Sequence, residues 1–87
     1  MKSNDKTRLR EFILQSLAGL GDKGAVSDDD SLFASGRLDS LSMTKLVMYL
    51  EDACGIDFGD VDFDADLLDS INLIEQFVDA EQSRAVR

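Results

Sequence analysis

Apolar residues recur at helical spacing in three separate stretches of this 87-residue chain, and this pattern restricts the fold more than any other feature. The stretches run from Ser3 or Asn4 to Leu20, from Ser40 to Cys54, and from Ser70 to about Ala80. In each stretch, residues three or four apart line one face of a helix. The expected core stripes are Leu9, Phe12, Ile13, Leu17 and Leu20; Met43, Leu46, Val47, Leu50 and Cys54; and Ile71, Ile74 and Val78. The pattern therefore predicts helices that share one core.

The segment between the first two helices is long and polar. It runs from Asp22 to Asp39, and Leu32, Phe33 and Leu38 are its sizeable apolar residues. Connections between bundle helices usually span about 2–8 residues, and longer loops in compact domains are often functional. We expect a loop that these apolar residues anchor to the core.

The second half of the chain holds a loop, a short helix and a tail. Residues from Ile56 to Phe63 alternate in polarity, but no second strand is available to pair with them, so an extended loop is expected. A short helix is expected near Ala65 to Asp69, and the tail from Glu81 to Arg87 is expected to fray. The sequence thus predicts an all-α bundle of three longer helices and one short helix, a single domain over residues 1–87 with its core at about 3–80.

The charge balance restricts the partners. Eighteen acidic residues stand against nine basic ones, which gives a formal net charge of -9 at pH 7. Such a chain repels nucleic acid and anionic lipid, so neither nucleic-acid binding nor membrane insertion is expected. Protein partners with a basic patch suit it better.

The residue types argue against an enzyme and for a reducing compartment. The chain has no histidine, which removes the commonest general base and metal ligand. Its one cysteine, Cys54, cannot form an internal disulfide and is expected to be a small buried residue. No apolar run is long enough for a membrane span, and the start does not read as a signal peptide. We therefore expect a cytoplasmic protein without catalytic residues.

Two large apolar residues of the second helix lie off its core stripe. Leu41 and Met48 stand about two turns apart, beside Thr44, Lys45 and Asp52, where water is expected. Single exposed apolar residues are common, so this pattern alone leaves open both a partner-recognition face and an exposed face without a role.

Three short motifs lie at fixed spacing around the second helix. They are Gly-Arg-Leu-Asp-Ser-Leu at 36–41, Leu-Val-Met-x-Leu-Glu-Asp at 46–52 and Gly-Ile-x-Phe at 55–58. Alone, Asp-Ser before a helix predicts only a cap, with Asp39 or Ser40 in that position and Gly55 ending the helix. Together, and with the helix pattern, the motifs resemble the acyl carrier protein family from about residue 9 to residue 80.

The resemblance implies a covalent cofactor. In that family the serine of Asp-Ser-Leu receives 4′-phosphopantetheine from coenzyme A, which makes Ser40 the expected attachment site. Asp39 would help to engage the phosphopantetheinyl transferase and its magnesium ion. A helix start offers unpaired N–H groups and a dipole that favours an anion such as the linking phosphate. The chain would then carry an acyl, aminoacyl or polyketide intermediate as a thioester and would be the transferase's substrate.

The resemblance also assigns the partner-binding residues. Leu41 and Met48 match positions that touch partner enzymes, and Glu51 and Asp52 would add negative charge at the rim. Lys45 stands where many fatty-acid-synthesis carriers have an acid. With Gly-Arg-Leu-Asp-Ser in place of the commoner Gly-Ala-Asp-Ser, it favours a dedicated carrier of a specialised ligase, lipid or natural-product pathway. The expected partners are a loading ligase and acyl-processing enzymes, and a monomer is expected.

Apolar residues near the last helices could shelter the cargo, pack the core, or do both. The acyl-pocket candidates are Leu46, Leu50, Phe58, Phe63, Ile71 and Ile74.

Other readings of the chain carry less weight. Leu-Asp-Ser-Ile at 68–71 echoes residues 38–41, but a helix cap explains it, so no second attachment site is predicted at Ser70. The acids between Asp57 and Asp66 lack the glycine bend and the final glutamate of a calcium loop, so at most weak divalent binding is expected. The alternative to a carrier is a small acidic interaction module without a cofactor.

Overall fold

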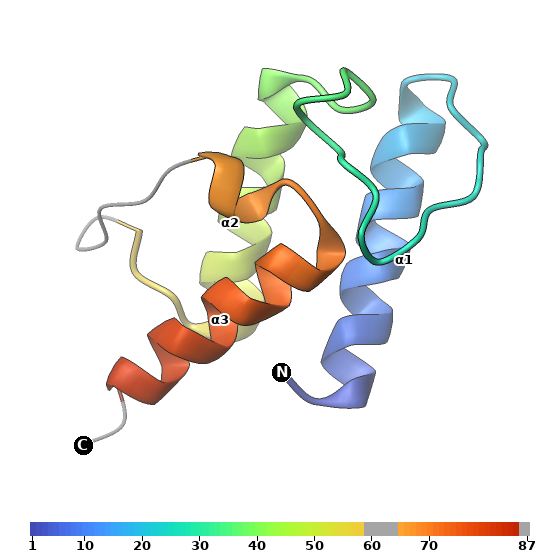
Figure 1. The fold of residues 1–87 in the computed structure, drawn as a ribbon. Helices are drawn as coiled ribbons and strands as arrows, with labels where there is room; N and C mark the ends of the chain where they lie inside the picture. Colours follow the sequence, from blue (N-terminus) through green and yellow to red (C-terminus); the bar gives the residue numbers. More distant parts are fainter. Residues whose placement is uncertain (59–64, 86–87) are drawn as a thin grey trace.

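The computed structural model describes residues 1–58 and 65–85, and these residues form helices and no strand. The α-helices are α1 (Ser3–Gly19), α2 (Ser40–Cys54) and α3 (Ile71–Ala85), and a 3-10 helix, η1 (Ala65–Leu68), precedes α3. α1 and α2 run in opposite directions, and the long loop between them turns back along α1 before it reaches the start of α2 (Figure 1). The predicted all-helical bundle with a long first loop is confirmed.

All the helices contribute to one core, and so does the long loop. The predicted stripes supply most of the buried side chains. Rings extend the packing at its margins, because Phe12 stacks on Tyr49 with centroids 4.6 Å apart and Phe58 stacks on Phe77 at 5.6 Å. The buried apolar residues are Leu9, Ile13, Leu17, Val26, Leu32, Leu38, Leu46, Leu50, Ile56, Leu68, Ile71, Ile74 and Val78.

Some residues of the predicted stripes are less buried than expected. Leu20 is 49% exposed, because it is the C-cap of α1 and its backbone has already left the helical conformation that would aim it at the core. Met43, Val47 and Cys54 are half-buried and pack against the core from its edge. Within the loop, Leu32 and Leu38 are buried as expected, and the sequence analysis missed Val26, which is also buried.

The last helix is longer than predicted. α3 begins at Ile71 and continues to Ala85, so it extends past the predicted end near Ala80. The expected fraying of the tail from Glu81 to Arg87 stays a prediction, and residues 86–87 lie outside the described residues. Beyond Ala80, the Gln82 side chain donates a hydrogen bond of 3.2 Å to the carbonyl of Cys54, which ties this extension to the end of α2. The predicted extended loop from Ile56 to Phe63 lies mostly outside the described residues. Among the described helices, none combines the length and the apolar character needed to cross a membrane.

Candidate functional site

The first turn of α2 begins at a carboxylate cap. Asp39 has an extended backbone, with φ -103° and ψ -179°, and its Oδ1 accepts a hydrogen bond of 2.9 Å from the Ser42 amide. Its carbonyl accepts the amide of Met43 at 3.1 Å. The bonds from Ser42 favour the charged carboxylate and lower the pKa of Asp39 below its ordinary value. Of the two residues predicted as the cap, Asp39 is the one that caps.

Ser40 is therefore the first helical residue, and its side chain is exposed. Its hydroxyl, its amide and the amide of Leu41 make no hydrogen bond with any described residue, since the Asp39 side chain pairs with Ser42 instead. Unpaired amides at a helix start attract an anion, and the helix dipole adds to that attraction. The site thus offers an accessible hydroxyl beside a position that suits a phosphate.

Asp69 fastens the second half of the long loop to the start of α3. Its carboxylate accepts three hydrogen bonds, from Ser31 Oγ at 2.6 Å and from the amides of Phe33 and Ala34 at 2.8 and 2.9 Å. Its carbonyl accepts the amide of Leu32 at 2.7 Å. Burial works to raise the pKa of the Asp69 carboxyl, but these hydrogen bonds together outweigh burial and lower it.

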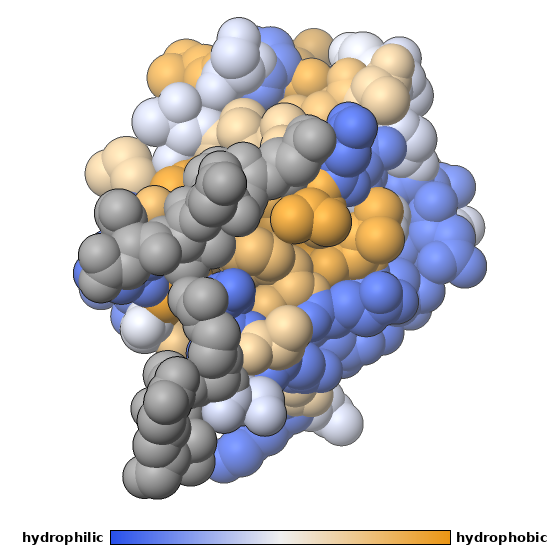
Figure 2. All heavy atoms as spheres, turned by 60° about the vertical axis from the view of Figure 1, so that its left-hand side comes forward, coloured by the Kyte–Doolittle hydropathy of each residue, from blue (hydrophilic) through white to orange (hydrophobic). Residues whose placement is uncertain are grey.

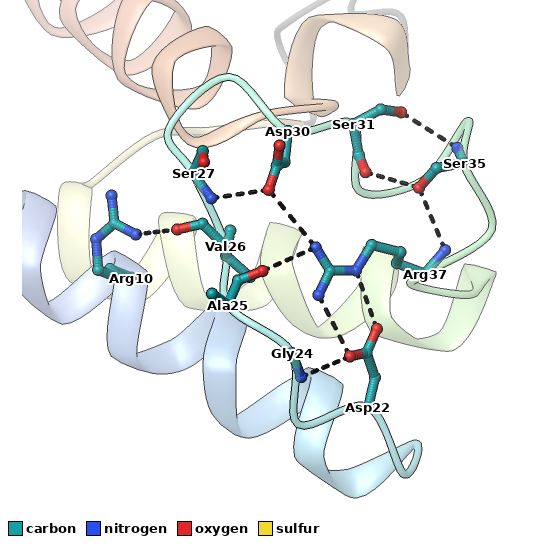
Figure 3. Close-up of polar contacts among 10 residues, drawn as sticks. All are labelled: Arg10, Asp22, Gly24, Ala25, Val26, Ser27, Asp30, Ser31, Ser35 and Arg37. Atoms are coloured by element: carbon teal, nitrogen blue, oxygen red, sulfur yellow. Dashed lines mark hydrogen bonds and ion pairs between the residues drawn. The ribbon is translucent and has the colours of Figure 1, made fainter.

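Arg37 closes the long loop on itself (Figure 3). Its guanidinium donates from Nε to Asp22 Oδ2 at 2.9 Å and from a terminal nitrogen to Asp22 Oδ1 at 3.3 Å, and it also reaches the Ala25 carbonyl at 3.3 Å. The hydrogen bond from Arg37 lowers the pKa of Asp22, and the same bond raises that of Arg37. Asp22 lies just after α1 and Arg37 just before α2, so this fork-shaped pair joins the two ends of the loop.

Basic residues of α1 hold the first half of the loop. Arg10 pairs with Asp28 and donates a hydrogen bond of 2.6 Å to the carbonyl of Val26. Lys6 lies 3.5 Å from Asp28 and 3.2 Å from Glu75, so it also links the loop to α3. A connection without regular structure is thereby attached to α1 and, through Lys6, to α3.

The second Asp-Ser pair, Asp69 and Ser70, lies one position earlier relative to the start of its helix than Asp39 and Ser40 do. Ser70 is the residue before α3, only 6% exposed, and its Oγ accepts a hydrogen bond of 3.1 Å from the Leu73 amide. Asp69, which precedes it, faces the loop and caps nothing in α3. The Ser70 hydroxyl is thus engaged in capping, as the sequence analysis expected, and Ser40 is the open one.

The residues expected to contact partners lie on the exposed side of α2. Leu41 is 62% and Met48 61% exposed, and Lys45, Glu51 and Asp52 are exposed as well. In the space-filling view, hydrophobic residues gather near the middle of the face shown, with hydrophilic residues along one side (Figure 2). The predicted exposure of Leu41 and Met48 is confirmed.

The acyl-pocket candidates fall into three groups. Leu46, Leu50, Ile71 and Ile74 are fully buried in the core, and Phe58 is half-buried against Phe77. Phe63 lies outside the described residues. Core packing therefore accounts for the four buried residues.

The described part of the chain shows no metal centre. Residues 1–58 and 65–85 contain no group of three or more side chains placed to hold a metal ion, although the middle of the acidic run lies outside these ranges. Cys54 is half-buried, and burial raises the pKa of its thiol, which keeps it in the less reactive protonated form.

Two residues that hold the site in place, Arg37 and Asp69, were not predicted as site residues from the sequence. Arg37 was noted only as a departure from a motif, and Asp69 only as part of an echo. Their partners lie 15 and 35–38 positions away along the chain, so helical periodicity carries no trace of these contacts. The available signal was a charged side chain beside a buried apolar one, Arg37 before Leu38 and Asp69 after Leu68.

Comparison with known families gives one result. A family model described as a phosphopantetheine attachment site matches residues 9–78, which is most of the chain. Searches of curated proteins and of solved structures gave no significant match.

Proposed function

The chain belongs to the phosphopantetheine attachment site family and is a carrier of that covalent cofactor, and we propose that Ser40 is the residue that bears it. The observation that carries this assignment is the contrast between the two serines that follow an aspartate. Ser40 is exposed on the first turn of α2, whereas Ser70 is 6% exposed and caps α3. A transferase can reach only the first without unfolding a helix start.

The first turn of α2 suits the chemistry of attachment. The Ser40 hydroxyl loses its proton and forms the phosphodiester, while the nucleotide part of coenzyme A leaves. The described residues place no general base beside Ser40 other than Asp39, whose Oδ1 is bound to the Ser42 amide. Activation of the hydroxyl is therefore assigned to the transferase, with Asp39 proposed to engage the transferase and its magnesium ion. The unpaired amides of the first turn would then face the linking phosphate.

The cofactor's thiol would carry an acyl, aminoacyl or polyketide group as a thioester. We assign the exposed face of α2 to the enzymes that load and process this cargo, with Leu41 and Met48 as apolar contacts and Lys45, Glu51 and Asp52 as charged ones. Lys45 places a positive charge on that face, which favours a dedicated carrier over one shared by general fatty-acid synthesis. A monomer suits a carrier that visits several enzymes, and one cysteine without a disulfide suits the reducing cytoplasm.

Intact mass tests the assignment of Ser40. The purified protein, Ser40→Ala and Ser70→Ala are incubated with coenzyme A, magnesium and a broad-specificity phosphopantetheinyl transferase. We expect the parent and Ser70→Ala to gain one phosphopantetheine and Ser40→Ala to gain none.

Two outcomes would overturn the proposal. A full gain on Ser40→Ala would move the attachment elsewhere. No gain on a folded parent, also with a transferase from its own source, would favour a cofactor-free interaction module.

A further inference from the structure

One short segment of the loop, residues 31–38, lies between the contacts with Asp69 at the start of α3 and the first turn of α2, where Ser40 lies. Asp69 binds the front of this segment through four hydrogen bonds, to Ser31, Leu32, Phe33 and Ala34. Three of these are donated by backbone amides, so they fix the chain itself and not merely one side chain. Bonds to a charged carboxylate are stronger than bonds between neutral groups.

The same segment closes on itself just before the attachment site. The amide of Leu38 donates a hydrogen bond of 2.7 Å to the Leu32 carbonyl, and the amide of Gly36 donates one of 3.0 Å to the Phe33 carbonyl. Gly36 has φ +83°, a conformation that favours glycine, which lets the chain turn here. Leu32 and Leu38 are both buried, so the closed segment is also anchored in the core. The next residue is Asp39, the cap of α2.

We propose that Asp69 is a positioning residue for the modification of Ser40, acting through segment 31–38 to hold the first turn of α2 where a transferase can use it. This inference rests on Ser40 being the attachment site. Asp69 never touches Ser40, and its contribution is to orient the loop backbone that leads into the Asp39 cap. Small misplacement of a reacting group lowers the rate of a reaction steeply.

The test compares variants that remove the same kind of group at different places. Asp69→Ala removes the carboxylate, and Asp69→Asn keeps an oxygen that can accept the two amide bonds. Asp29→Ala is the matched control, because Asp29 also joins the loop to α3, through Asn72 at 2.7 Å, but precedes segment 31–38. Val78→Ala, at a buried position in the middle of α3, lowers stability and removes no hydrogen bond of the loop.

Two quantities are measured at a temperature at which circular dichroism shows every variant folded. They are kcat/KM for phosphopantetheine transfer and the exchange rates of the Phe33 and Ala34 amides. We expect Asp69→Ala to lower kcat/KM about 10-fold and to speed both amide exchanges, with Asp69→Asn between it and the parent. Asp29→Ala and Val78→Ala should keep kcat/KM within about 2-fold of the parent.

The failure of this inference differs from the failure of the proposed function. If Ser40 of the parent is modified and Asp69→Ala reacts as fast as the parent, or no slower than Val78→Ala, Asp69 has no positioning role. If the parent is not modified at all, the attachment assignment fails, and the amide exchange rates still report whether Asp69 orders the segment.

Discussion

At position 40 a serine begins a helix, whereas at position 70 a serine precedes one, and this shift of one residue decides which hydroxyl is open. A residue just before a helix turns its side chain back onto the first amides, as Asp39 and Ser70 both do. A residue one place later projects outward. The two Asp-Ser pairs are thus alike in sequence and opposite in exposure.

The cap of α2 gives a prediction at this scale. Asp39→Ala leaves the Ser42 amide without its partner, so we expect the midpoint of thermal unfolding to fall by about 5 °C. Asp39→Asn retains an accepting oxygen and should stay close to the parent. Asp52→Ala, an exposed acid near the other end of α2, is the control and should not lower the midpoint. Equal loss in the Ala and Asn variants would show that charge, and not capping, holds the turn.

At the scale of elements, α2 combines a buried stripe with an exposed face of mixed charge. Leu46 and Leu50 fix one side in the core, which leaves Leu41, Lys45 and Met48 on the other side. Charges at the rim of a contact chiefly set the rate of encounter. Lys45 should therefore slow the approach of any partner whose docking surface is basic.

Reversal of this charge tests the role of the face. With a transferase whose docking surface is basic, we expect Lys45→Glu to raise kcat/KM about 3-fold at low salt, with the gain shrinking as salt increases. Lys23→Glu makes the same change in net charge on the exposed loop and is the matched control. If both variants respond equally, net charge alone is responsible, and the position of Lys45 on α2 has no special effect.

For the whole molecule, three hydrogen-bonded carboxylates predict how the free energy of unfolding depends on pH. Asp22, Asp39 and Asp69 have pKa values lowered from 3.8, so between their folded and unfolded values the unfolded chain binds more protons. Their contribution to the free energy of unfolding is therefore present above about pH 4 and lost as the pH falls through the folded values.

A pH series of thermal unfolding at constant ionic strength measures this effect. The midpoint should fall below pH 4, and Asp69→Asn should fall less steeply there because it cannot bind the proton. Protonation also relieves the repulsion that accompanies a net charge of -9, but the parent and variant share nearly all of that change. Parallel curves for the two proteins would contradict the assignment to Asp69.

The sequence predicted those parts of the molecule that rest on local patterns. Apolar periodicity located α1 and α2 almost to the residue, and the Asp-Ser signal located the start of α2. Contacts between distant segments leave no such pattern, so the bonds of Arg37 and Asp69 were missed. The extension of α3 was missed because its last turns are mostly polar, and a contact with the end of α2 accompanies them.

The difference between Ser40 and Ser70 exists only while the chain is folded. In an unfolded chain, Leu-Asp-Ser-Leu and Leu-Asp-Ser-Ile are nearly the same tetrapeptide, and neither serine is shielded. An enzyme that selects Ser40 must therefore recognise the folded start of a helix and not the tetrapeptide sequence alone. The attached group would then mark chains that have completed folding, so that only folded molecules receive cargo.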